Sequence, residues 1–157
     1  MTTIIDGSAG ITYPNSTVQA SAGVVLQVVN ATYSTYTSFT STSFVDTGLT
    51  ATITPKFSTS KILVSVSING INGSGIAFTF NIANGSNTQI LSIMDNNLAG
   101  YAGYSASATT LHSPATTFAY TYKVQVKANT AGTVYFNNYI TTNGNTGSTI
   151  TLMEIAG

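Results

Sequence analysis

Two segments of this chain alternate apolar and polar residues strictly, and this period-two pattern constrains the fold more than any other feature. In KILVSVSI (61–68) one face carries Ile62, Val64, Val66 and Ile68, and Ser65 and Ser67 lie on the other. In FAYTYKVQVKA (118–128) one face carries Phe118, Tyr120, Tyr122, Val124 and Val126, and the other carries Thr121, Lys123, Gln125 and Lys127. Because successive side chains of a strand point to opposite faces, both segments predict strands with one buried face.

Other apolar runs predict six further strands: VVLQVVNAT, LTATIT, IAFTFNI, TQILSIM, GTVYFNN and TITLMEI. Clusters of Gly, Asn and Ser separate them, and no window of ten or more residues has helical spacing. We therefore predict an all-β domain over residues 24–157, built as an antiparallel β-sandwich of jelly-roll-like connectivity. A closed barrel is the alternative. The segment YSTYTSFTSTSF (33–44) keeps no single period and fits either a bulged pair of strands or a long loop.

The chain has very few charged residues, and this limits its partners. Asp, Glu, Lys and Arg make up 5% of its 157 residues, against about 25% in a typical soluble domain. Four lysines and no arginine cannot neutralise a run of phosphates, so we expect no nucleic acid partner. No basic amphipathic stretch predicts membrane binding. A net charge of zero leaves little repulsion between copies, which favours self-association over a monomer kept soluble by Thr and Asn.

Targeting and redox signals are also missing from the sequence. The opening MTTIIDGSAG has neither the basic region nor the continuous apolar run of a secretory signal, and no segment approaches the roughly 18 apolar residues of a membrane span. The chain has no cysteine, which excludes disulfides and thiolate zinc sites. We expect a protein that is made in a cytoplasm and carries no export signal.

Residues with catalytic chemistry are scarce. The histidine is His112, and the carboxylates are Asp6, Asp46, Asp95 and Glu154. No Gly-x-Ser-x-Gly elbow is present, and the Asn-rich stretch at Asp95 matches no calcium loop. We therefore predict a non-enzymatic protein with no cofactor and no metal.

Three of these residues have structural interpretations. His112 is expected in a loop before the Ser-Pro turn, and Asp46 is expected to cap a turn before Gly48. Glu154 shares a strand face with Leu152, where an unpaired carboxylate would be costly if buried. We expect Glu154 to be exposed, although a lysine or a neighbouring subunit could supply a partner.

Several stretches resemble the virion surface proteins of tailed bacteriophages. The opening GSAGITYPNSTVQASA is similar to an N-terminal signature of phage fibre and virion surface proteins. The segments STSFVDTGLTATITPKFSTSKILVSVSI, SPATTFAYTYKVQVKA and TITLMEI resemble segments of marine phage structural proteins. The resemblance implies a β-rich, commonly trimeric virion component with an N-terminal attachment segment and a C-terminal sandwich.

The chain accordingly divides into residues 1–23, expected to be an extended attachment arm, and the domain over residues 24–157. The arm would dock on the particle or on a neighbouring subunit, and Pro14 would help to keep it extended. Its apolar anchors would be Ile4, Ile5, Ile11, Tyr13 and Pro14. The alternative is a frayed tail without a partner.

Three functions follow as hypotheses. The first is a homotrimeric capsid decoration or cement protein that contacts the major capsid protein, which the lack of a long fibrous stalk favours. The second is a short tail-fibre or tail-tip protein that binds a host receptor, and the third is a free carbohydrate-binding module. Tyr101 and Tyr104, in the loop expected over residues 101–112, would suit stacking on a host glycan, although tyrosine is also a common strand or interface residue. The expected location is the virion, after synthesis in the host bacterial cytoplasm.

Overall fold

The chain folds into strands and contains no helix among the residues that the structure describes. The computed structural model describes the backbone of residues 4–6, 10–12, 18–19, 24–73, 75–97, 104–138 and 146–157. The strands are β1 (Ile4–Asp6), β2 (Gly10–Thr12), β3 (Val18–Gln19), β4 (Val25–Tyr33), β5 (Thr37–Phe39), β6 (Val45–Ile53), β7 (Lys61–Gly73), β8 (Ala77–Asn84), β9 (Gln89–Asn97), β10 (Tyr104–His112), β11 (Tyr120–Ala128), β12 (Val134–Phe136) and β13 (Ser148–Ile155).

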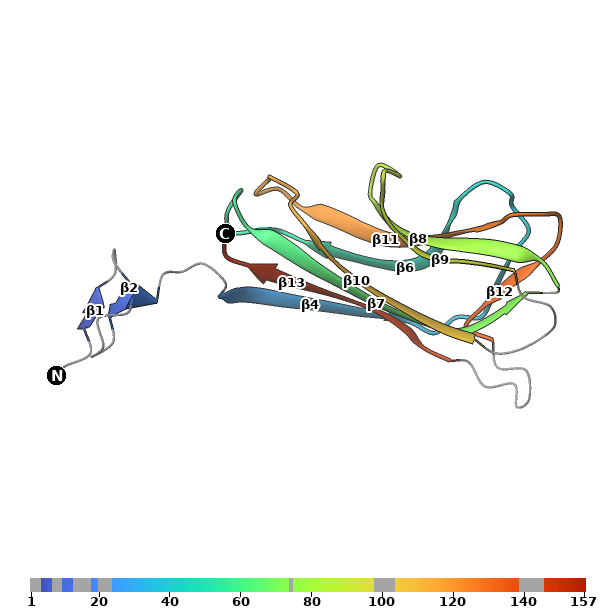
Figure 1. Ribbon diagram of the computed structural model, residues 1–157, viewed down its shortest axis with the longest axis horizontal. Coiled ribbons are helices and arrows are strands. Elements are labelled where there is room, and N and C mark those ends of the chain that lie inside the picture. Colours follow the sequence, from blue (N-terminus) through green and yellow to red (C-terminus); the bar gives the residue numbers. More distant parts are fainter. Residues whose placement is uncertain are drawn as a thin grey trace.

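Eight long strands form two antiparallel sheets that pack face to face (Figure 1). One sheet has the order β4-β13-β7-β10, and the other has the order β6-β11-β8-β9. We number the eight long strands 1 to 8 along the chain. The sheet β4-β13-β7-β10 then has the order 1-8-3-6, and the sheet β6-β11-β8-β9 has the order 2-7-4-5. This nested order is that of a jelly roll. The prediction of an antiparallel sandwich with jelly-roll connectivity is confirmed.

The core lies between the two sheets and comes from the alternating positions that the sequence marks. Ile62, Val64, Val66 and Ile68 of β7 and Tyr122, Val124 and Val126 of β11 are all buried. At the end of the sandwich where β4 ends, β12 pairs with the last residues of β7 and with β5. There the Phe136 ring packs 6.1 Å from the Tyr33 ring and 5.9 Å from the Phe80 ring, measured between centroids. The segment 33–44, which the sequence left open, contains the last residue of β4 and the short strand β5.

Two expectations on strand limits are wrong. Residues Tyr104–His112 form β10 instead of a loop, and β10 pairs along β7 from Tyr104↔Ile71 to His112↔Ile62. The inward positions of β10 include Ala106, Ala108 and Thr110, whose small apolar area gives a weak alternation signal. Phe118 lies before the start of β11 and is 80% exposed, because the strand and its inward face begin only at Tyr120.

The N-terminal segment differs from the extended arm that the sequence led us to expect. β1 pairs antiparallel with β2, and β2 pairs antiparallel with β3, so the backbone reverses direction twice between Ile4 and Gln19. Gly7 and the Pro14-Asn15 pair stand between these strands in the sequence, and such residues favour chain reversals. Ile4, Ile5 and Ile11 lie on β1 and β2, while Tyr13 and Pro14 lie outside the described residues. The role of these five residues as anchors stays a prediction.

Candidate interaction surfaces

One end of the sandwich, which we call the junction end, gathers the chain segments nearest to the N-terminal region. It consists of Val24, the loop 54–60 between β6 and β7, the loop 113–119 between β10 and β11, and residues 156–157. The backbone N–H of Ala156 donates to the carbonyl of Val24 at 2.9 Å, which holds the C-terminal residues beside the start of β4. Figure 1 shows these segments together at the end where β4 begins.

Exposed hydrophobic side chains concentrate at this end. The structure describes seven large exposed ones, and six of them lie at the junction end or on the strand row next to it: Val24, Val25, Val28, Phe57, Leu111 and Phe118. Phe57 is 54% exposed and Phe118 is 80% exposed. The seventh, Tyr36, follows β4 at the other end of the sandwich. Single exposed apolar residues are common on soluble proteins, but a gathered set marks an interaction surface.

An apolar row crosses the outer face of the sheet β4-β13-β7-β10 close to the junction end. The register places Val28 beside Met153, Met153 beside Leu63, and Leu63 beside Leu111. The next rows along the same face are polar, for example Thr151, Ser65 and Thr109. The apolar surface therefore belongs to the junction end and does not cover the whole sheet.

Glu154 lies beneath this surface and is fully buried, which contradicts the expectation of exposure. Its carboxylate accepts hydrogen bonds from Gln27 Nε2 at 2.5 Å and from the backbone N–H of Lys56 at 2.7 Å. Gln27 Nε2 also donates to the Thr54 carbonyl at 2.7 Å. The buried carboxylate therefore fixes the loop that carries Phe57. The donors to this carboxylate include the Gln27 amide and the backbone, and none of them is a lysine side chain.

These hydrogen bonds set the charge state of Glu154. Burial alone raises the pKa of the carboxyl, because it disfavours the ionised form. The side chains of Gln27 and Ser60 and the backbone N–H groups of Lys56 and Phe57 outweigh that effect and lower the pKa below its ordinary value. These four donors therefore favour the ionised form of Glu154.

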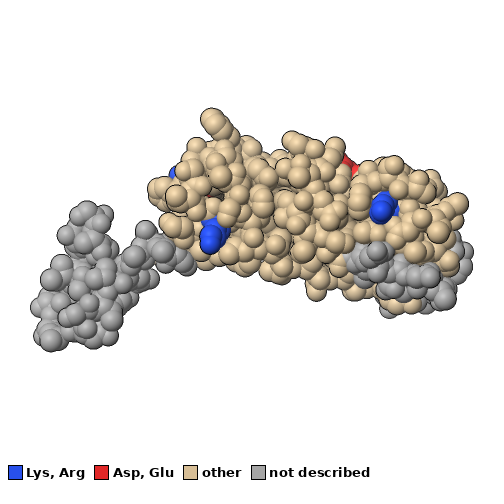
Figure 2. Space-filling view, turned by 45° about the horizontal axis from the view of Figure 1, so that its top comes forward, with Lys and Arg blue, Asp and Glu red and all other residues tan. Residues whose placement is uncertain are grey.

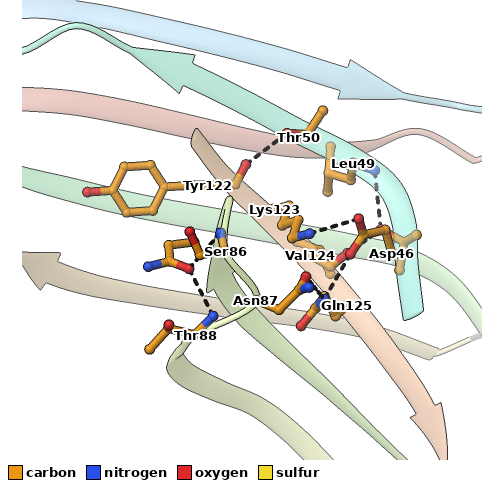
Figure 3. A network of polar contacts seen from close by, with 12 residues as sticks. Asp46, Leu49, Thr50, Ser86, Asn87, Thr88, Tyr122, Lys123, Val124 and Gln125 are labelled. Carbon is orange, nitrogen blue, oxygen red and sulfur yellow. Dashed lines mark hydrogen bonds and ion pairs between the residues drawn. The ribbon is translucent and has the colours of Figure 1, made fainter. Parts of the chain in front are cut away.

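The outer face of the second sheet carries an open hollow of about 350 Å³ beside Asp46. Asp46 lies in β6 and not in a capping turn, so the expectation for this residue is wrong. Its carboxylate accepts from Lys123 Nζ at 2.9 Å and from Gln125 Nε2 at 2.8 Å (Figure 3). Gln125 Nε2 also donates to Asn87 Oδ1 at 3.0 Å, which links the β8–β9 loop to this cluster. Burial raises the pKa of Asp46, but these hydrogen bonds and the Lys123 charge lower it overall.

A bulge in β6 shapes the hollow. Asp46 pairs with Gln125 and Thr50 pairs with Lys123, so three residues of β6, Thr47 to Leu49, stand opposite Val124 alone. The Thr47 hydroxyl donates to the Val124 carbonyl at 2.9 Å and accepts from the Leu49 N–H at 3.2 Å, which replaces the missing ladder bonds. Gly48 has φ of +96°, a conformation that favours glycine. Bulges of this kind re-aim side chains and are frequent at functional sites.

The remaining predicted site residues do not form one site. Tyr104 is half-buried at the start of β10, and Tyr101 lies outside the described residues, so glycan stacking on this pair stays a prediction. His112 ends β10, and its Nδ1 lies 2.9 Å from the Tyr122 hydroxyl. Burial lowers the pKa of His112. His112 is half-buried in the strand, where its ring packs against Tyr120 and the buried Tyr122, so the expectation of a loop histidine is wrong.

The described residues offer neither a metal site nor a membrane-spanning helix. Among the described residues, no group of three or more His, Cys, Asp or Glu side chains is placed to hold a metal ion. Within the same ranges, no helix has the length and apolar character needed to cross a membrane.

Comparison with known proteins places the chain in no family. No protein-family model matches it, and no curated protein matches it. Among solved structures, a chain from the structure of infectious bursal disease virus Gx strain aligns at 13% sequence identity with a TM-score of 0.44, and the alignment covers 83% of this chain and 37% of that chain. This chain thus spans little more than a third of the matched chain. The identity and the TM-score are too low for this likeness to bear on function.

Proposed function

We propose that this protein is a non-enzymatic structural component of a tailed-phage virion, present in multiple copies and attached through its junction end. The observation that carries the proposal is the concentration of exposed hydrophobic side chains at that end and on the strand residues next to it, six of the seven that the structure describes. Burial of such a set against a partner is favourable by about 25 cal/mol for each Å² of apolar surface removed from water. The rest of the sandwich surface offers no comparable apolar set among the described residues.

The low number of charged residues supports incorporation into an assembly. Tan surface dominates the face drawn in Figure 2, and few charged side chains interrupt it. A surface of hydroxyls and amides can be covered by neighbours without removing many charges from water, which is costly when the charges lose their solvent. Copies of such a protein can therefore pack closely in an assembly.

The charges at the junction end favour contact with another protein over contact with the same end of a second copy. The exposed charged side chains described there are Lys56 and, at the start of β7 next to it, Lys61. Two copies that met symmetrically through this end would bring their lysines together, and like charges in contact are unfavourable. We therefore propose that the junction end docks on another virion protein, and that a homotrimer forms through other faces of the sandwich. A capsid decoration or cement protein is our first choice, and a short tail-fibre or tail-tip protein is the alternative.

The test is incorporation into phage particles. We expect the double variant Phe57→Ser/Phe118→Ser to fold, because both side chains are more than half exposed, and to be lost from particles. Tyr36→Ser is the matched control, since it removes an aromatic side chain that is 46% exposed at the other end. Incorporation of the double variant at the wild-type level would refute docking through the junction end. Hundreds of copies per particle would indicate the shell, and a few or tens would indicate the tail.

The oligomeric state is tested separately by native mass spectrometry of the purified protein. We expect a homotrimer for the wild type and for the double variant, because the proposed trimer contacts lie on other faces. A wild type that stays monomeric at micromolar concentration would refute the trimer. A free carbohydrate-binding module would also be monomeric, and would bind sugar without any role in particle assembly.

A further inference from the structure

The hollow beside Asp46 has the features of a built binding site. It is lined by residues of β6, β11 and the β8–β9 loop, including Leu49, Thr50, Gly85 and Lys123. Its volume of about 350 Å³ lies within the range of small-molecule sites, which begins near 300 Å³. A second hollow of about 180 Å³ lies next to it and shares Gly85 and Thr121 as lining residues. Tyr120 and Asn84 also line this second hollow.

The polar groups of the hollow are held in place before any ligand binds. Gln125 is 3% exposed, and its amide fixes the Asp46 carboxylate from below. The side chain of Lys123 is 13% exposed, whereas that of Asp46 is 53% exposed, so the carboxylate faces solvent. The β8–β9 loop is fixed as well, because Asn84 Oδ1 accepts from the backbone N–H groups of Ser86 at 3.0 Å and Thr88 at 2.8 Å. Such preorganisation lowers the entropic cost of binding.

The charges of the hollow exclude several ligand classes. The Asp46–Lys123 pair is neutral overall, so a cation or an amine gains little from a carboxylate that a lysine already occupies. A phosphate or other anion would meet the exposed Asp46 carboxylate. A wholly apolar ligand would remove water from that carboxylate without replacing its hydrogen bonds, which is costly.

A polyhydroxylated ring meets all of these conditions. Carboxylate oxygens accept hydrogen bonds and an ammonium group donates them, and here the two groups lie 2.9 Å apart. Neighbouring sugar hydroxyls both donate and accept, so they can bond to both members of such a pair. The Thr50 hydroxyl uses its proton on the Tyr122 carbonyl at 3.0 Å and keeps its oxygen as an acceptor. The backbone of Gly48 and the bare backbone of Gly85 line the hollow without a polar side chain and leave room for the C–H face of the ring.

We propose that this hollow binds a neutral saccharide, with the first ring over Asp46, Lys123 and Thr50 and a second ring over Gly85 toward Tyr120. The site is distinct from the junction end, and it lies on the opposite sheet from Tyr104. It goes beyond the proposed structural role and does not depend on it, because the proposal rests only on the residues that line the hollow.

Nuclear magnetic resonance titration of the full chain tests the proposal. The probes are the methyl glycosides of glucose, galactose, mannose and N-acetylglucosamine, together with lactose, maltose and cellobiose, each up to 50 mM. We expect at least one probe to shift the backbone amides of Gly48, Thr50 and Gly85 in a saturable manner. Absence of saturable shifts with every probe would overturn the proposal, as would shifts confined to the amides around Tyr104.

Two variants locate the binding. Asp46→Ala removes the central acceptor, and Gly85→Val fills the hollow. A Cβ on Gly85 would meet its nearest described neighbour, the Thr121 Cβ, at 3.5 Å, which is ordinary van der Waals contact, so we expect Gly85→Val to fold even if Asp46→Ala does not. Both should weaken binding at least tenfold, whereas Thr109→Val, on the outer face of the other sheet, should not change it. Wild-type affinity in a folded Gly85→Val protein would overturn the assignment.

Discussion

Glu154→Gln tests whether the buried carboxylate stabilises the junction end as the structure indicates. Glutamine has nearly the same shape, and its carbonyl can still accept from the Lys56 N–H. Its NH₂ group would face the Gln27 amide, which now donates at 2.5 Å to a carboxylate oxygen. One charge-assisted bond is lost and another is weakened, each worth about 1.5–3 kcal/mol, while the variant avoids the desolvation of a charge. We expect a net loss of about 1–3 kcal/mol in the free energy of unfolding.

The assay is urea unfolding at pH 7, with a thermal scan beside it. A loss of about 2 kcal/mol corresponds to a drop of about 4–8 °C in Tm for a domain of this size. The slope of the urea transition should not change, since the variant exposes the same surface on unfolding. A urea midpoint and a Tm equal to those of the wild type would refute the energetic role of Glu154.

The same variant should also change the pH dependence of stability. The pKa of Glu154 is lowered in the folded state, so its contribution is present above the pKa of the unfolded chain and is lost as the pH falls through the folded pKa. We expect the wild type to lose more stability than Glu154→Gln between pH 7 and pH 3. Equal losses would show that the folded carboxyl titrates like an unfolded one. Asp46→Asn is the control, because the pKa of Asp46 is also lowered but its side chain is half exposed.

Three further predictions concern the bulge and the core. Thr47→Val should lower the free energy of unfolding by about 1–3 kcal/mol, measured with urea, because it removes the buried hydroxyl that bridges Leu49 and Val124. Thr47→Ser keeps the hydroxyl and should lower this free energy by less. Equal losses for the two variants would show that the hydroxyl is unimportant. Gly48→Ala should lower Tm markedly, because the residue has φ of +96° and the new Cβ would lie 2.7 Å from the Tyr33 ring. Gly85→Ala is the control. Equal Tm values for the two variants would contradict the reasoning. Phe136→Ala should cost about 3–5 kcal/mol through the cavity left beside the Tyr33 and Phe80 rings, and a loss below about 1 kcal/mol would mean that the core is repacked.

Residues far apart in the chain form both candidate surfaces, which is why sequence reasoning missed them. Gln27 and Glu154 are 127 positions apart, and Asp46 and Lys123 are 77 positions apart. Asp46 in FVDTGL has the local sequence of a turn, and only its pairing with β11 shows that it lies in a bulged strand. Phe118 continues an alternating pattern, but the strand starts after it. No local signal shows that Asp46 lies in a strand or that the strand begins after Phe118, because pairing with a partner strand decides both.

The sequence by itself determined that the domain is all-β and which side chains of the strongly alternating strands face the core. In segments such as KILVSVSI the alternation is strong, and side-chain direction in a strand is a local property of the backbone. Only the tertiary structure decided that the weakly patterned Tyr104–His112 joins the sheet, since its position depends on backbone pairing with β7 and not on its own apolar area. Only the tertiary structure brought Phe57, Phe118 and Leu111 to one end, because strand order and register set which loops meet.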